Sequence, residues 1–213
     1  MDNVKLWHNE TVGLRVIEAL KKNGFKAAYL KSSKEARDYV GKEIEPGMEV
    51  AFGGSMTIKS LGIQELAKEK NAIILDHGDS NLSSEERLKV MRKELTSDLF
   101  LSSSNAVTIN GELVNIDGAG NRVAAITFGP KKVILVVGIN KITENLDSAF
   151  QRLKLIACPQ NNKRLNKDNP CTKVGYCVEC NSDSRICRIY SVIKRKPSAS
   201  DITVVIVGEN LGY

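Results

Sequence analysis

The 213-residue chain lacks several features that would place it in a membrane or outside the cell. No apolar run approaches the roughly eighteen residues that a membrane helix needs, so we expect no membrane span. The opening residues MDNVKLWHNETVGLRVIEALKKNG carry charges throughout, unlike a secretory signal peptide. We therefore expect a cytoplasmic protein, in which cysteine thiols stay reduced.

Signatures of nucleic-acid binding and of common nucleotide sites are also missing. Aromatic residues make up only 5% of the chain, and no run of them interleaves with basic residues. The positive charge behind the net +6 is concentrated in one segment, because residues 151–200 hold eleven Lys and Arg against three Asp and Glu. No Walker loop or nucleophile elbow occurs, and Gly118-Ala119-Gly120 lacks the third glycine of a dinucleotide fingerprint. We expect no nucleic-acid partner.

The two histidines have no cysteine, aspartate or serine partner at a spacing that indicates chemistry. His8 and His77 are therefore interpreted as surface or capping residues. His77 follows an expected strand and could reach the edge of a pocket there.

What is present is a regular alternation of helix and strand patterns. Apolar periodicity, caps and turn residues predict helices at 4–22, 33–43 and within 56–70 and 83–97, and strands at 25–30, 48–52 and 72–76. Ser83 or Ser84 can cap the last of these helices. Alternating strands and helices favour a parallel sheet covered on both faces, that is, a three-layer, Rossmann-like open α/β sheet.

The pattern changes after residue 99. Asn110-Gly111 predicts a hairpin with positive φ at both central positions, which adds a local antiparallel element to the sheet. The apolar stretch 133–138 predicts a buried strand, residues 144–156 a helix, and 202–208 a final strand. We expect one domain over residues 1–213, with a cysteine-rich, metal-binding insertion at 158–187.

The first candidate for a ligand site is the turn Gly53-Gly54-Ser55-Met56-Thr57, between a strand and a helix. Gly53 and Gly54 allow the backbone to approach a ligand, and Ser55 and Thr57 add hydroxyl groups. Such a loop suits a phosphate or carboxylate, although Gly-Gly-Ser is equally typical of an ordinary capped turn.

The second candidate is the turn Asp117-Gly118-Ala119-Gly120-Asn121-Arg122, at the end of a strand. Ligands of open α/β sheets usually bind on that side. Arg122 could hold a carboxylate or phosphate, and Asp117 could act as a catalytic base, with Gly118, Gly120 and Asn121 beside them. In the alternative interpretation, Asp117 caps backbone N–H groups and Arg122 pairs with a surface acid.

Four cysteines form a compact set with the spacing C-x5-C-x2-C-x6-C: Cys171, Cys177, Cys180 and Cys187. Reduced thiols that cluster in a polar segment indicate a four-ligand metal site, and the basic residues around them favour the thiolate form. Zinc and a [4Fe–4S] cluster both take four thiolates, so the identity of the metal stays open. Whether Cys158 is also a ligand stays open as well.

Four stretches of the chain taken together resemble the LUD (lactate utilisation) domain family. They are FGGSMTIKSLGI, the long segment FLSSSNAVTINGELVNIDGAGNRVAAITFGPKKVILVVGINKI, the loop PCTKVGYCVECNSDSRIC and the closing VVIVGENLGY. The resemblance covers nearly the whole chain. It implies a fold similar to ribose-phosphate isomerases, glucosamine-phosphate deaminases and CoA transferases, and a link to lactate oxidation beside iron–sulfur proteins. The Lys-bearing loop of the isomerases has no evident counterpart.

The favoured hypothesis is a component of cytoplasmic L-lactate or 2-hydroxy-acid oxidation, with a small anionic metabolite as ligand, an iron–sulfur cluster as cofactor and iron–sulfur proteins as partners. Two alternatives stay open: a metabolite-binding module with a structural zinc, and a sugar-phosphate or CoA-type transferase-like enzyme. Oligomeric state, homo-oligomer included, is open as well.

Overall fold

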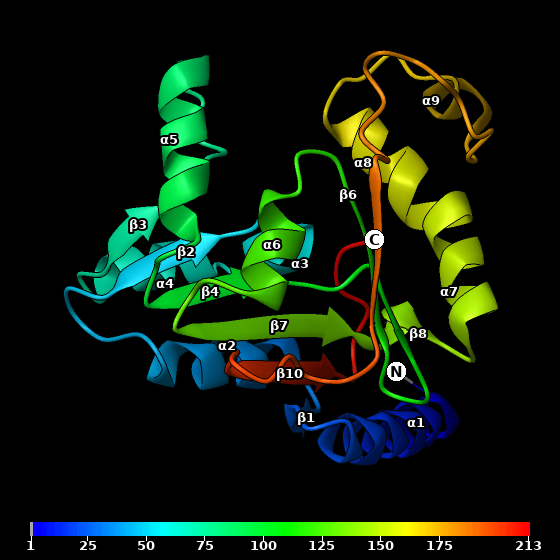
Figure 1. Cartoon of the computed structure of the whole chain (residues 1–213). Helices are drawn as coiled ribbons and strands as arrows, with labels where there is room; N and C mark the ends of the chain where they lie inside the picture. Colours follow the sequence, from blue (N-terminus) through cyan, green and yellow to red (C-terminus); the bar gives the residue numbers. More distant parts are fainter. Residues whose placement is uncertain (1) are drawn as a thin grey trace.

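A six-stranded parallel sheet forms the centre of the computed structural model, which describes residues 2–213 (Figure 1). In spatial order its strands are β1 (Lys26–Leu30), β10 (Ile202–Val207), β7 (Lys132–Gly138), β4 (Leu99–Ser102), β2 (Glu49–Phe52) and β3 (Ile73–Leu75). Every neighbouring pair is parallel. The expected open α/β sheet is therefore confirmed.

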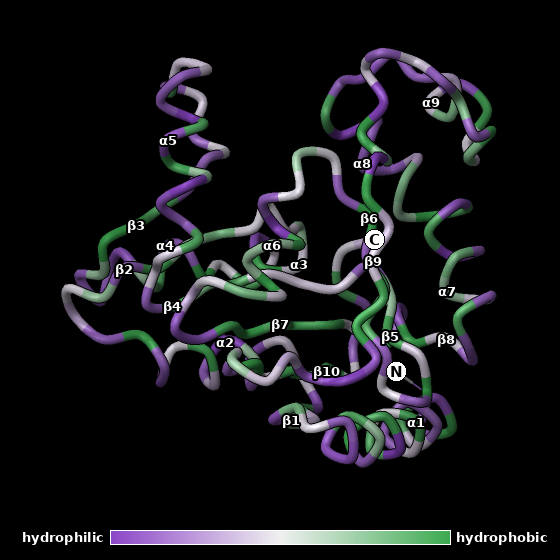
Figure 2. The backbone as a smooth tube through the Cα atoms, in the orientation of Figure 1, coloured by the Kyte–Doolittle hydropathy of each residue, from purple (hydrophilic) through white to green (hydrophobic). Residues whose placement is uncertain are grey.

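Helices cover both faces of this sheet and make three layers. Val133 and Leu135 of β7 point to one face and Ile134 and Val136 to the other, as a period of two requires. All these side chains are buried, and most of β7 has the hydrophobic colour in Figure 2. One core includes residues of α1 (Asn3–Lys22) and α6 (Asn121–Thr127), and the other includes residues of α2 (Ser33–Lys42), α3 (Met56–Ser60) and α4 (Ile63–Glu69).

Local signals fix several of the helix ends. Ser83 caps α5 (Ser84–Glu94) in a full capping box with Glu86, which confirms one of the two expected caps. The single helix expected within 56–70 is two helices, α3 and α4, because Gly62 between them has a left-handed φ of 61°. The break keeps α3 short and close to the turn that precedes it.

The hairpin belongs to a second, four-stranded sheet and not to the main one. In spatial order this sheet contains β8 (Ile142–Thr143), β5 (Ala106–Thr108), β6 (Leu113–Asp117) and β9 (Ile189–Ile193). Positive φ occurs at Gly111 only, so the expected conformation of Asn110 is wrong. Thr108 N–H bonds to Glu112 O and leaves a three-residue loop, which needs a single left-handed residue.

The helix expected at 144–156 continues into the cysteine segment. It comprises α7 (Leu146–Arg152), a π-helical stretch (Leu153–Ala157) and α8 (Cys158–Arg164), and the short helix α9 (Cys171–Val174) follows. These elements stand beside the second sheet (Figure 1), and the chain then forms β9, a strand the sequence did not indicate. Among residues 2–213, no helix is both long and apolar enough to cross a membrane.

Candidate functional site

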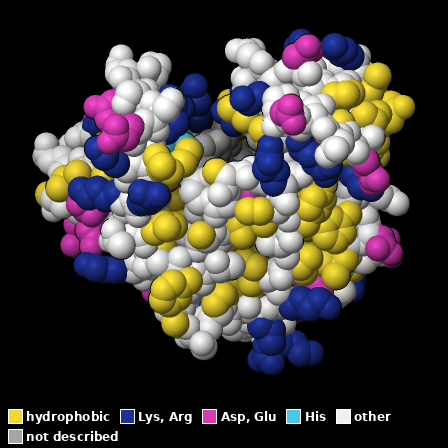
Figure 3. Space-filling view, turned by 45° about the horizontal axis from the view of Figure 1, so that its top comes forward, with side chains coloured by type: hydrophobic (Ala, Val, Ile, Leu, Met, Phe, Trp, Pro, Cys, Tyr) yellow, Lys and Arg dark blue, Asp and Glu magenta, His cyan; other side chains and the backbone are white. Residues whose placement is uncertain are grey.

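A cavity of about 270 Å³ opens at the carboxyl ends of the central strands, where both glycine-rich turns meet. Its walls also include the serine-rich segment after β4, the residue Lys141 and the helix α8. Figure 3 shows the hollow between the α5 side of the molecule and the cysteine segment, with Lys and Arg side chains around it. Parallel strands bring their following loops to one edge, so turns distant in sequence become neighbours.

Of the first turn, Gly53, Gly54 and Ser55 line the cavity. A Cβ atom on Gly53 would lie 2.7 Å from Ser102 Oγ and 2.9 Å from a ring carbon of Phe100, so only glycine allows this close approach to β4. Ser55 Oγ accepts from Ile58 N–H at 3.3 Å and so caps α3. Thr57 is fully buried behind the cavity wall, where its hydroxyl donates to Leu211 O at 3.2 Å.

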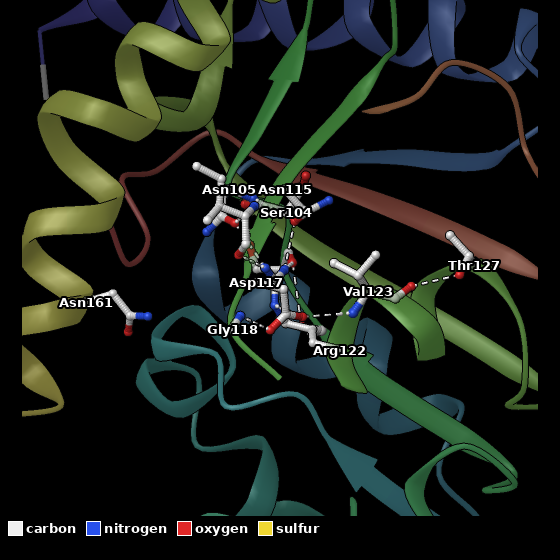
Figure 4. A network of polar contacts seen from close by, with 12 residues as sticks. Ser104, Asn105, Asn115, Asp117, Gly118, Arg122, Val123, Thr127 and Asn161 are labelled. Atoms are coloured by element: carbon white, nitrogen blue, oxygen red, sulfur yellow. Dashed lines mark hydrogen bonds and ion pairs between the residues drawn. The ribbon is translucent and has the colours of Figure 1, made fainter. Parts of the chain in front are cut away.

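Of the second turn, Asp117, Gly118, Asn121 and Arg122 line the same cavity, and Gly120 does not. Both carboxylate oxygens of Asp117 accept backbone N–H groups, Oδ1 from Gly118 at 2.7 Å and Oδ2 from Val123 at 3.0 Å (Figure 4). These bonds hold the turn against the start of α6. Asp117 therefore caps the backbone, as the alternative interpretation of this turn expected.

Both terminal nitrogens of Arg122 are bonded to protein acceptors (Figure 4). Nη1 donates to Ser103 O at 3.2 Å and Asn115 Oδ1 at 2.7 Å, and Nη2 donates to Asn105 Oδ1 at 3.0 Å and Ile116 O at 2.8 Å. Asp117 Oδ2 lies 3.8 Å from Nε. Burial lowers the pKa of Arg122, and Asp117 opposes that effect. Since four donors are already used, this guanidinium ties β6 to the segment after β4.

Lys141 is the last residue of the 3-10 turn Ile139–Lys141, which follows β7, and it lines the cavity. Its Nζ donates to Thr57 Oγ1 at 2.9 Å and Ser103 Oγ at 3.1 Å, and the residue is 4% exposed. Burial, followed by the charges of Arg152 and Arg122, lowers the pKa of Lys141 to about 7. The sequence offered no glycine-rich, lysine-bearing loop, and this lysine was missed.

His77 lines the cavity and is held by an acid from α5. Its Nδ1 lies 2.7 Å from Glu94 Oε1, which also accepts the His77 backbone N–H at 3.1 Å. Glu94 is 1% exposed and has no other partner at Oε2 among residues 2–213. Burial opposes charging of His77, but the hydrogen bond and charge of Glu94 raise its pKa overall. The surface or capping role expected for His77 is wrong, whereas its place at the pocket edge is confirmed.

All five cysteines border one small cavity of about 10 Å³ inside the cysteine segment. Cys158 and Cys187 hydrogen-bond to each other, which raises the pKa of Cys158 and lowers that of Cys187 to about 7. These two also line the large cavity, so they form the wall between the two spaces. In residues 2–213, no three His, Cys, Asp or Glu side chains are arranged as ligands of a single metal ion.

Comparisons with known proteins agree with this architecture. A family model described as "LUD domain" matches residues 14–207. A solved structure of a DUF162 family protein from Deinococcus radiodurans is similar with a TM-score of 0.53, at 12% identity, over 93% of this chain and 98% of that one. At this identity the likeness concerns the fold alone.

A second solved structure, eIF2B beta from Chaetomium thermophilum, has a TM-score of 0.38 and 18% identity over 54% of this chain and 40% of its own. That similarity is too low to support an inference. No curated protein matches the chain.

Proposed function

The chain belongs to the LUD domain family, which is linked to lactate utilisation, and we propose that it contributes to cytoplasmic oxidation of L-lactate or a related 2-hydroxy acid. The observation that carries this proposal is the shared wall of the two cavities. Cys158 and Cys187 border both the large polar cavity and the cysteine cavity, so a bound substrate would lie beside the thiols. Electron transfer between a substrate and a group bound by the thiols would be favoured by such proximity.

Charge and size support a small anion as the ligand of the large cavity. Lys141 and Arg152 are buried in this region, and the Arg122 side chain is 14% exposed. Among residues 2–213 the one acid that pairs with any of these three cations is Asp117, at 3.8 Å from Arg122. Asn121 contributes a buried Nδ2 group that has no acceptor among residues 2–213. The volume of about 270 Å³ lies just below the roughly 300–1,000 Å³ of drug-sized ligand sites and suits a small hydroxy acid.

Asp117 stays the proposed base at this site, and Arg122 stays a proposed contact for the ligand carboxylate. Because both groups already make several bonds to the protein, they would act from fixed positions. Arg122 would contribute chiefly a constant positive potential, and Asp117 would reach a substrate hydroxyl only from its lone pairs not directed at Gly118 and Val123.

Cys171, Cys177, Cys180 and Cys187 would hold the proposed iron–sulfur cluster. The residues fit the group in number and in chemistry, and they share one cavity. In a [4Fe–4S] cluster each of the four thiolates would bind a different iron. The present space of about 10 Å³ requires the thiols to move when metal binds, which couples binding to local folding. A cluster bound by these thiols would supply one-electron transfer.

Iron–sulfur proteins are the proposed redox partners. Apolar side chains around the cysteine segment are exposed, among them Leu155 (61%), Val174 (52%) and Tyr176 (51%). Exposed apolar groups of this kind support docking of another protein near the thiols.

The test begins with protein purified without oxygen. We expect iron and acid-labile sulfide in cluster stoichiometry, and loss of both in Cys180→Ser. Calorimetric titration with L-lactate and pyruvate, with acetate as the control that lacks the second functional group, tests the pocket. Absence of iron, or no binding of either acid, would refute the proposal.

One zinc per chain would instead favour the alternative, a metabolite-binding or transferase-like protein with a structural metal. Turnover assays with phosphosugars and CoA esters would then separate a transferase from a binding module.

A further inference from the structure

Lys141 is a buried cation of the large cavity that keeps a donor free. A lysine ammonium has three N–H groups, and two of them are directed at Thr57 Oγ1 and Ser103 Oγ. Within residues 2–213, no carboxylate lies within ion-pair distance of its Nζ. Arg122, in contrast, has every Nη hydrogen bond directed at protein acceptors.

The fold holds Lys141 in this position from both sides. Asn140, the residue before it, accepts Leu211 N–H at 3.0 Å and donates to Gly212 O at 3.2 Å, so the closing segment of the chain fixes the turn. A Cβ atom on Gly212 would lie 3.3 Å from Nζ and 2.7 Å from Thr57 Oγ1. The amine is thus packed closely on one side and meets the cavity on another.

The surroundings of Lys141 are unfavourable for an isolated cation. Thr57 of α3 and Ser103 after β4 offer neutral hydroxyls, while Arg122 of α6 and Arg152 of α7 add positive charge. Arg152 is 7% exposed and donates to the carbonyl oxygens of Asn140 and Asn105, and no acid of the described residues 2–213 pairs with it. A buried charge without a counter-charge is strongly destabilising, and an anion in the cavity would relieve this.

We propose that Lys141, with the hydroxyls of Ser103 and Thr57 beside it, is the anion-binding group of this pocket and holds the carboxylate or phosphate of the ligand. The inference rests on the proposed function only in placing the ligand in this cavity. It assigns the principal contact to Lys141 and leaves Arg122 as a positioning residue that shapes the wall. Anion binding stabilises the protonated amine, so ligand and proton bind together.

The experiment compares three variants by calorimetric titration with pyruvate, L-lactate and inorganic phosphate at pH 7. We expect Lys141→Met to lose roughly tenfold to a hundredfold in affinity, which is the range for one charge-assisted hydrogen bond. Lys141→Arg, which retains the charge, should recover part of that loss. Lys5→Met, at an exposed site on α1, makes the same change of net charge and should bind as the unsubstituted protein does.

A direct measurement on the unsubstituted protein covers the case in which Lys141→Met does not fold. With lysine labelled at Cε, NMR should show the pKa of one buried lysine rising when pyruvate or phosphate is added. Unchanged affinity in Lys141→Met, no movement of that resonance, or no binding of any anion would overturn the proposal. Binding of phosphate through Lys141 without binding of lactate or pyruvate would uphold it and refute the lactate function.

Discussion

Replacing Arg122 by methionine separates a structural role from a ligand-binding role. The guanidinium donates four hydrogen bonds to acceptors in the wall of the cavity. Two of these acceptors, Asn105 Oδ1 and Asn115 Oδ1, keep a backbone donor after the substitution, from Ile116 and Asn105. The carbonyl oxygens of Ser103 and Ile116 lose their charged donor.

Buried acceptors that lose a charged donor cost about 1.5–3 kcal/mol each, and removal of the buried charge itself returns a part. We therefore expect Arg122→Met to lower the free energy of unfolding by about 3–5 kcal/mol, a large share of the roughly 5–15 kcal/mol typical of a protein. Arg122→Lys should lose less stability than Arg122→Met, because an ammonium can still donate to up to three of the four acceptors.

The assay is urea denaturation followed by circular dichroism, with Arg92→Met as control. Arg92 is exposed on α5, so its replacement should change stability by no more than about 0.5 kcal/mol. If Arg122→Met unfolds like the control but loses affinity for pyruvate, then Arg122 is a ligand clamp and the structural reasoning is wrong.

Three further outcomes are expected. Glu94→Gln should lower the pKa of His77, measured by NMR of the imidazole. Because Glu94 raises that pKa, the stability that the pair contributes is full below about pH 6.5 and is lost as the pH rises through the pKa of the folded state. Gly53→Ala should destabilise the protein and reduce anion binding, since the new Cβ would lie 2.7 Å from Ser102 Oγ, and thermal unfolding with titration checks both. The low pKa of Lys141 should make stability rise with pH between about 7 and 10, by up to about 1.4 kcal/mol per pH unit, and Lys141→Met should lack this slope.

The central sheet could be predicted from the sequence because its signals are local and strong. Apolar runs such as 133–138, helices that begin at a capping serine and short connections together leave a parallel sheet between helices as the consistent arrangement. The missed elements have weak local signals. β9 has exposed residues at its start, Ile189 and Tyr190, and is a strand because it pairs with β6.

The sequence by itself determined the chemistry that is available: two turns able to approach a ligand, a compact set of thiols and the family to which they belong. Only the tertiary structure decided which of these groups have donors available to a ligand. Arg122 has the charge to bind an anion, but its terminal nitrogens donate to protein acceptors in the cavity wall. Lys141 has no distinguishing sequence motif, yet it keeps one N–H donor free. The physical reason is that burial and hydrogen-bond partners come from segments far apart in the chain, such as Ser103 and Lys141, and no local pattern records them.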